Sequence, residues 1–218
     1  MRIVVIGGHG KIALLLAPLL TQTGHRVEAW IRDPDQAATV EATGAEAVLA
    51  DVEQLNVAEM TERLVGRDAV IWSAGAGGGN PRRTYAVDRD AAIRSMDAAV
   101  AARVSRYLMV SYTRSGRDPE VGPDDSFYPY AEAKATADAH LRQVPLNWTI
   151  LGPGRLTDGN GTGLVEVGHH VTCGDTARAN VARVALAVIG RSDLNGVSLF
   201  FRDGNVPIAE ALQAVSVG

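Results

Sequence analysis

Short apolar runs rich in β-branched residues alternate with longer stretches of helical periodicity in the first half of the chain. The short runs have the length of buried strands, and the longer stretches carry their apolar residues on one side. Pro34 opens one such stretch, and Gly24 and Gly44 close two of them, as helix boundaries commonly require. Strands are therefore expected at 3–6, 26–31, 45–51, 68–75 and 106–112, and helices at 11–24, 34–44, 57–66 and 85–104.

Alternating strands and helices predict a parallel sheet with helices on both faces, and right-handed crossovers make it a doubly wound sheet. The second half is less regular. It is expected to contain a polar loop at 113–126, a helix at 128–144, a strand at 147–154, a glycine-rich loop at 155–163, a strand near 165–173, a helix near 175–190, a strand at 197–202 and a helix at 207–215. We expect residues 1–218 to form one α/β domain, in which 153–218 supply a small substrate-side region.

Composition narrows the class of protein. The chain has 218 residues, of which 46% are apolar and 21% charged, and its net charge is −4, as in ordinary globular proteins. The acidic balance argues against a nucleic-acid binder, and no apolar stretch has the length of a membrane span. The single cysteine, Cys173, suits a reducing compartment, so a cytoplasmic location is expected. His169 and His170 lack a third ligand at suitable spacing, so no metal site is expected.

Three glycines lie in the segment GGHGKIA at 7–13, between the first expected strand and the first expected helix. Glycines at this place make a tight turn and let a pyrophosphate approach the backbone, while a small residue at position 13 lets helix and strand pack closely. The helix N-terminus then offers free amides and a partial positive charge to the phosphates, and an anion there would favour a lysine in the first turn. The residues expected at the phosphates are Gly7, Gly8, His9, Gly10, Lys11 and Ile12.

The end of the second strand predicts which dinucleotide is bound. An acidic residue there would bind the ribose of NAD, but Ile31 takes that place and Arg32 follows it. Because a guanidinium can bind phosphate through two N–H groups, Arg32 favours the 2′-phosphate of NADP. Asp33 keeps NAD open, since a shift of one residue would bring its carboxylate to the ribose. Further contacts are expected at the ends of the third and fourth strands, from Asp51, Val52, Ser73, Ala74 and Gly75.

Of the 21 basic residues, only Lys11 and Lys134 are lysines, and Lys134 follows Tyr130 by four residues, on the same face of an expected helix. An ammonium near a phenol favours the phenolate, so Lys134 is expected to lower the pKa of Tyr130 from about 10. Such a tyrosine can give or take a proton near neutral pH, and the lysine can also hold the nicotinamide ribose. Ser111 or Thr113, on one face at the end of the fifth strand, is expected to hold the substrate oxygen.

Together, the glycine turn and the segments RVEAWIRD, VSYT, YAEAK and WTILGPGRLTDGNGTG resemble the atypical short-chain dehydrogenase/reductases. These are Rossmann-fold NAD(P)H-binding proteins related to the nucleotide-sugar epimerases and to the NmrA-like group. The resemblance covers nearly the whole chain and includes GDTARANVARV and DGNVPIAEAL in its last fifth.

This resemblance implies that Tyr130 and Lys134 are catalytic, with a serine or threonine assisting. It also implies that Pro153 and Gly154 form the turn beside the nicotinamide. The sequence departs from the family at Ala13, which replaces the third glycine, and at Gly152, where an arginine commonly precedes the Pro-Gly pair.

The function expected from these features is an NADP-dependent oxidoreductase that moves hydride between the nicotinamide and a small carbonyl or alcohol substrate. One alternative is a non-catalytic NADPH-binding redox sensor of the NmrA-like kind, which would not need the Tyr130–Lys134 pair. Another is an epimerase or dehydratase with tightly held NAD, against which Arg32 argues. The short stretch between Thr113 and Tyr130 favours a substrate smaller than a sugar nucleotide. A homodimer is compatible with this interpretation.

Overall fold

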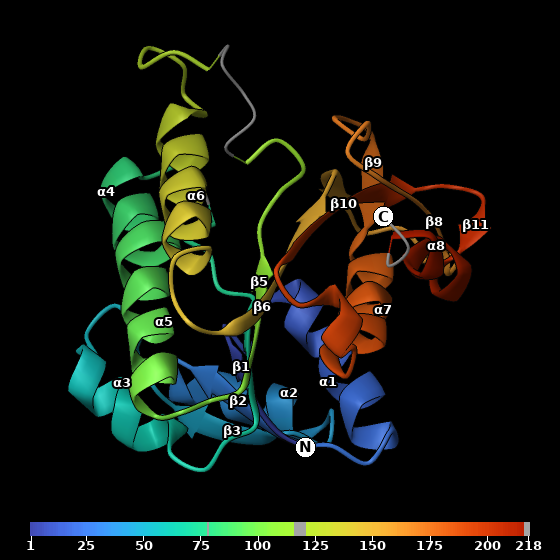
Figure 1. Cartoon of the computed structure of the whole chain (residues 1–218). Helices are drawn as coiled ribbons and strands as arrows, with labels where there is room; N and C mark the ends of the chain where they lie inside the picture. The colour runs from blue at the N-terminus through green and yellow to red at the C-terminus, as the bar shows by residue number, and fades with distance from the viewer. Residues whose placement is uncertain (78, 116–120, 216–218) are drawn as a thin grey trace.

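A computed structural model describes residues 1–77, 79–115 and 121–215 of the protein (Figure 1). Its strands are β1 Arg2–Ile6, β2 Arg26–Ile31, β3 Glu46–Leu49, β4 Ala69–Trp72, β5 Arg106–Val110, β6 Asn147–Pro153, β7 Arg155–Thr157, β8 Leu164–Val167, β9 Asp175–Ala177, β10 Val197–Asp203 and β11 Val206–Pro207. Its α-helices are α1 Lys11–Gln22, α2 Ala37–Glu41, α3 Val57–Leu64, α4 Pro81–Thr84, α5 Ala92–Ala101, α6 Tyr128–Leu141, α7 Arg178–Ile189 and α8 Ile208–Val215. A π-helical segment, Tyr85–Ala91, joins α4 to α5, and single 3₁₀ turns occur at Pro34–Gln36 and Ser192–Leu194.

Nine of the described strands form one sheet in the order β11-β8-β10-β6-β5-β4-β1-β2-β3, and β7 and β9 form a separate two-stranded sheet. In this sheet order, the seven strands from β10 to β3 are parallel, and β8 and β11 extend the sheet beyond β10 by antiparallel pairing. The chain thus reverses its direction of progress between β1 and β4, where doubly wound sheets bind their ligands. The expected doubly wound, mostly parallel fold is confirmed.

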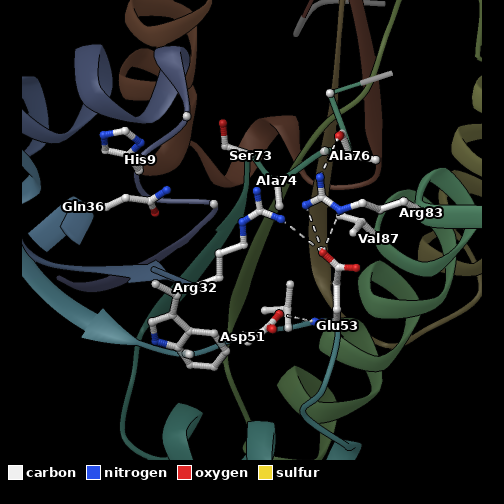
Figure 2. A pocket seen from close by; sticks show the side chains of 17 residues that line it. His9, Arg32, Gln36, Asp51, Glu53, Ser73, Ala74, Ala76, Arg83 and Val87 are labelled. Atoms are coloured by element: carbon white, nitrogen blue, oxygen red, sulfur yellow. Dashed lines mark hydrogen bonds and ion pairs between the residues drawn. The ribbon is translucent and has the colours of Figure 1, made fainter. Parts of the chain in front are cut away.

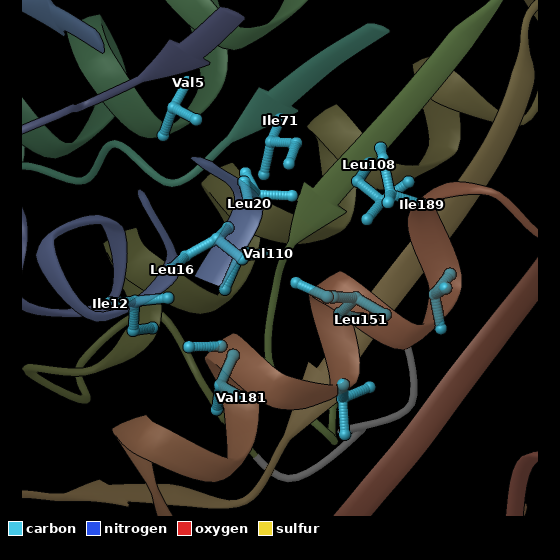
Figure 3. Packing of buried hydrophobic residues seen from close by; sticks show 14 of the residues in the cluster. Val5, Ile12, Leu16, Leu20, Ile71, Leu108, Val110, Leu151, Val181 and Ile189 are labelled. Carbon is cyan, nitrogen blue, oxygen red and sulfur yellow. The ribbon is translucent and has the colours of Figure 1, made fainter. Parts of the chain in front are cut away.

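Side chains alternate between the two faces of the central strands, and each face has its own hydrophobic core. In β1, Ile3 and Val5 pack on the face covered by α1 and α7, whereas Val4 and Ile6 pack on the face covered by α3, α5 and α6 (Figure 1). On the first face, apolar residues of α1 and α7 meet those of β4, β5 and β6 (Figure 3). Two covered faces explain why the central strands read as continuous apolar runs.

The segment between β4 and β5 differs from the single helix expected at 85–104. It begins earlier, at Pro81, because the Asn80 side chain accepts a hydrogen bond from the Arg83 amide and so caps α4. The next seven residues, Tyr85–Ala91, are π-helical and turn the buried Asp88 carboxylate toward the interior. π-Helical turns are uncommon and are often found at functional sites.

Three further expectations are corrected. The helix expected at 34–44 is a 3₁₀ turn followed by the short α2, because the Asp33 side chain accepts from the Asp35 amide and starts the turn early. The strand expected near 165–173 ends at Val167. Residues 155–157 and 175–177, expected as loop and helix, pair as β7 and β9.

Gly78 lies outside the described residues, as do residues 116–120 of the loop expected at 113–126. Within the ranges that are described, no helix combines the length and apolar character needed to cross a lipid bilayer.

Candidate cofactor and active site

Three adjoining hollows follow the carboxyl ends of the parallel strands. The first, of about 320 Å³, lies beyond β1, β2 and β3; the second, of about 840 Å³, lies between the end of β4, the π-helical segment and α6; the third, of about 820 Å³, lies beyond β5 and β6. The first and second hollows share residues 73–77, and the second and third share Ser111, Asp125, Phe127, Tyr130 and Leu156. Because neighbouring hollows share walls, they form one groove.

The glycine turn forms the wall between the ends of β2 and β4. Gly7 has a φ of +84°, and a Cβ on it would lie 2.6 Å from the Ala74 Cα. A Cβ on Gly8 would lie 2.6 Å from the Ala29 Cβ. The Gly10 amide closes the turn by donating to the Gly7 carbonyl at 2.9 Å, and no side chain caps the start of α1. The backbone therefore leaves a cradle with open amides, as a bound phosphate requires.

Four of the six expected phosphate-site residues line the groove, and Gly8 and Lys11 do not. His9 lines the first hollow together with Gly7 and Gly10, and Ile12 lines the second. Lys11 is not among the residues that line the groove. Its Nζ donates to Asp158 Oδ2 at 2.6 Å in a separate surface depression, and this bond lowers the pKa of the Asp158 carboxyl. The ion pair gives Lys11 a partner from a distant part of the chain, which the sequence did not reveal.

The expected adenosine-side residues gather around the first hollow, as Figure 2 shows. Arg32 points into the hollow, and its Nη1 lies 3.5 Å from Glu53 Oε1. Asp51 and Val52 line the same hollow, where the Asp51 carboxylate accepts a hydrogen bond from the Glu53 amide at 3.0 Å. Sequence reasoning missed Glu53 and Arg83, since neither belongs to a strand end with a recognised role.

Residues 73–75 line the wall common to the first and second hollows. The Ser73 Oγ is buried and makes no hydrogen bond within the described part of the chain. An unsatisfied buried hydroxyl is costly, so it points to a polar group that completes the site. The open turn, the Ser73 hydroxyl and the Arg32 guanidinium together fit a dinucleotide.

One face of α6 carries Tyr130, Lys134 and Asp138 at successive spacings of four residues. Lys134 is buried; its Nζ donates to the Val110 carbonyl at 3.2 Å and lies 3.4 Å from Asp88 Oδ1. The same Nζ lies 5.9 Å from the centre of the Tyr130 ring. Burial lowers the pKa of Lys134, but the interactions with Tyr130 and with the carboxylates of Asp88 and Asp138 outweigh it and hold that pKa above its ordinary value. Lys134 is therefore a fixed cation.

The pKa of Tyr130 is raised, not lowered as expected from the Tyr-Lys spacing. Burial of the phenol is the largest cause; Lys134 opposes it, but the carboxylates of Asp88 and Asp138 raise the pKa further. The sequence showed the lysine on the same helix, whereas Asp88 comes from a distant segment. The phenol thus keeps its proton at neutral pH.

The two candidate hydroxyls, which follow β5, both donate hydrogen bonds to partners within the protein. Ser111 Oγ donates to Asp138 Oδ2 at 2.7 Å, and Thr113 Oγ1 donates to the Val171 carbonyl at 2.8 Å. Because a hydroxyl has one proton, neither of them donates to a group in the groove in this arrangement. Both side chains line the third hollow, where each can offer an oxygen lone pair, but not its proton, to a bound group in this arrangement.

Asp138 was missed by the sequence reasoning, although its spacing from Lys134 could have revealed it. Its side chain is fully buried, and its Oδ2 also accepts from Ser115 Oγ at 2.6 Å. Burial raises the pKa of this carboxyl, while the hydrogen bonds from Ser115 and Ser111 and the charge of Lys134 act against the rise. Asp138 therefore holds the hydroxyl of Ser111, which lines the groove, together with that of Ser115.

Pro153 and Gly154 line the third hollow beside Tyr130. The missing arginine before them has a steric explanation, because a Cβ on Gly152 would lie 2.6 Å from the Phe200 ring of β10. Tyr112 and Phe127 complete the wall, with ring centres 5.5 and 5.2 Å from that of Tyr130. The third hollow thus has an aromatic side next to the phenol.

The chain matches the NAD(P)H-binding family over residues 7–192. It is 34% identical over 215 residues to a Bacillus subtilis protein called the uncharacterized sugar epimerase YhfK, a match that covers 98% of this chain and 99% of that protein. A solved structure from Bacillus halodurans, described as a candidate NAD-dependent epimerase/dehydratase, has a TM-score of 0.90 at 29% identity and covers 98% of this chain and 99% of its own. The oxidoreductase ylbE of Lactococcus lactis has a TM-score of 0.90 at 28% identity, with coverages of 100% and 98%. The chain therefore belongs to the NAD(P)H-binding family, among the atypical short-chain dehydrogenase/reductases that its motifs resemble.

Proposed function

We propose that this protein is an NADP-dependent oxidoreductase that reduces a small carbonyl compound. One observation carries the proposal: the second hollow is lined at one end by Ile12 and residues 73–77, beside the glycine turn, and at the other by Tyr130 and Lys134. A ligand that binds its diphosphate at the turn can therefore extend to the phenol within one groove.

Residues of the first and second hollows would hold the dinucleotide. The amides that begin α1 would bind its diphosphate, Arg32 its 2′-phosphate and Lys134 the ribose next to the nicotinamide. Bound there, the cofactor supplies the hydride chemistry that amino-acid side chains lack. Family membership supports a nicotinamide cofactor, and Arg32 is our reason for choosing NADP.

Tyr130 is the proton donor in this proposal. Its raised pKa keeps the phenol protonated at neutral pH, the form needed to protonate the oxygen of a carbonyl substrate. Its hydroxyl makes no hydrogen bond to any residue of the described ranges. The hydroxyls of Ser111 and Thr113, in contrast, already donate hydrogen bonds to Asp138 and to the Val171 carbonyl. With its proton committed to Asp138, Ser111 can still accept a hydrogen bond through its lone pairs.

Lys134 acts as a fixed positive charge in this site. Asp88 and the Val110 carbonyl hold its ammonium near the Tyr130 ring, so proton loss from the phenol leaves an anion beside an existing cation. A buried charge of this kind stabilises a developing phenolate more strongly than it would in water. The resulting role is general acid catalysis by Tyr130, supported by Lys134.

The proposal is tested by titrating the purified protein with NADPH and NADH and then screening small aldehydes and ketones for oxidation of NADPH. We expect Tyr130→Phe to leave NADPH affinity within about twofold and to lower kcat/KM by about 10²- to 10⁴-fold, the usual contribution of a general acid. Tyr128→Phe is the matched control. It removes a phenol hydroxyl two residues away on α6 that does not line the groove, and its turnover should equal that of the wild type.

Equal turnover by Tyr130→Phe and the wild type would remove the catalytic role of the phenol. Binding of NADPH without turnover of any carbonyl would favour the redox-sensor alternative. The name of the Bacillus subtilis relative motivates a second panel, of sugar nucleotides. Interconversion of sugar isomers without net consumption of NADPH would replace the oxidoreductase by an epimerase.

A further inference from the structure

Three charged side chains from separate segments meet in the first hollow. Arg32 follows β2, Glu53 follows β3, and Arg83 lies on α4 (Figure 2). Arg83 Nε and Nη2 each lie 3.0 Å from Glu53 Oε1, and Arg32 Nη1 lies 3.5 Å from that same oxygen. Two guanidinium groups thus share one carboxylate oxygen.

The position of Glu53 is fixed by its backbone. The Asp51 carboxylate accepts the Glu53 amide, and Arg94 of α5 donates to the carbonyls of Val52 at 2.9 Å and Leu55 at 3.1 Å. These bonds hold both sides of the turn that carries the Glu53 side chain. The carboxylate is therefore presented to the hollow before any ligand arrives.

The two arginines are not equivalent. Arg83 makes two hydrogen bonds to Glu53 and a third from Nη1 to the Ala76 carbonyl at 3.3 Å, so several contacts hold its guanidinium. Arg32 reaches Glu53 by one longer ion pair, and its side chain is 52% exposed. An exposed single ion pair of this length is weak, so Arg32 is the partner that can be exchanged.

We propose that Glu53 sets the choice between NADPH and NADH, because it competes with the 2′-phosphate for Arg32. A phosphate that binds Arg32 must take it from Glu53 and must also approach that carboxylate, which repels it. A ribose with a free 2′-hydroxyl meets the opposite situation, since a carboxylate accepts hydrogen bonds from hydroxyls. Glu53 therefore limits the preference for NADPH that Arg32 provides, and Arg83 holds the carboxylate in place to do so.

This inference rests on the proposed cofactor site, and equilibrium binding tests it without reference to turnover. Dissociation constants for NADPH and NADH are measured by calorimetry for the wild type, Glu53→Gln, Arg32→Ala and the double variant. We expect Glu53→Gln to raise the NADPH-over-NADH preference by about tenfold, the size of one hydrogen bond to a charged group. Arg32→Ala should lower that preference by a similar factor.

The double variant separates competition from simple repulsion. If Glu53 acts mainly by holding Arg32, the effect of Glu53→Gln on the preference should shrink to less than about threefold once Arg32 is alanine, and the direct action of the carboxylate on the ribose or its phosphate accounts for what remains. Glu46→Gln is the matched control, because it also removes one negative charge but lies exposed at the far end of β3. It should leave the preference unchanged, and thermal unfolding confirms that each variant is folded.

The outcomes distinguish this inference from the proposed function. Failure of the wild type to bind either dinucleotide would overturn both. Binding of both dinucleotides with an unchanged preference in Glu53→Gln would overturn the role of Glu53 alone. An undiminished effect of Glu53→Gln in the Arg32→Ala background would overturn the competition for Arg32.

Discussion

At the glycine turn the backbone itself forms the wall of the groove, whereas at α6 the wall consists of side chains that share charges and protons. The turn fits because Gly7 and Gly8 have no Cβ to meet Ala74 and Ala29. The α6 face works through a chain of partners, in which Asp88 holds Lys134 and Asp138 accepts a hydrogen bond from the Ser111 hydroxyl. A shape made by missing atoms is a local property, while the protonation of a buried side chain depends on every charge around it.

The largest effect should come from adding one methyl group at the turn. Gly7→Ala combines a left-handed φ with a Cβ 2.6 Å from backbone atoms, so we expect a loss of about 2–5 kcal/mol in unfolding free energy and a loss of dinucleotide binding. Gly24→Ala is a close control, because Gly24 has the same φ of +84° with nothing within 4 Å. It should cost about 1–2 kcal/mol and leave binding intact. Denaturant unfolding and calorimetry measure both, and equal behaviour would contradict the cradle.

On the α6 face, the buried Asp138 carboxyl should make the unfolding free energy depend on pH. Because burial raises the pKa of Asp138, folding binds its proton more tightly, and this contribution to stability is complete at acidic pH and is lost as pH rises through the raised pKa. Asn at this position does not titrate. The unfolding free energy of the wild type relative to Asp138→Asn should therefore fall with rising pH, by up to about 1.4 kcal/mol per pH unit within that window.

Denaturant unfolding at a series of pH values measures this slope. Lys134 and Arg142 are the charges that act on Asp138, so a control must leave them in place. Asp35→Asn removes an exposed carboxylate outside the groove and should leave the slope unchanged. A parallel pH dependence of wild type and Asp138→Asn would mean that Asp138 stays ionised throughout.

The smallest effect is expected at Lys11. This residue follows the glycine turn in the sequence, but its side chain contacts Asp158 outside the groove. Its ammonium is held by Asp158, so Lys11→Gln should change NADPH affinity by less than about twofold. Calorimetry of this variant beside Arg32→Ala measures the contrast. A tenfold loss in Lys11→Gln would show that the lysine leaves Asp158 when the dinucleotide binds.

The same contrast explains what could be predicted from the sequence. The order of strands, the turn at 7–13 and the Tyr130–Lys134 face follow from local spacing, and the sheet topology confirms the fold. The partners of these residues did not follow, because Asp88 depends on a π-helical segment and Val171 approaches Thr113 only through the fold. Long-range hydrogen bonds decide which proton is available, and no spacing rule reports them.

The contact between Gly152 and Phe200 constrains how this protein could have diverged from relatives with an arginine at that place. An arginine introduced at 152 would collide with the Phe200 ring. Replacing Phe200 by a smaller residue, in turn, leaves a cavity unless a larger side chain fills it. The two positions are thus epistatic: either substitution alone passes through a poorly packed intermediate. We therefore expect the two changes to occur together, which reconstruction of ancestral sequences would test.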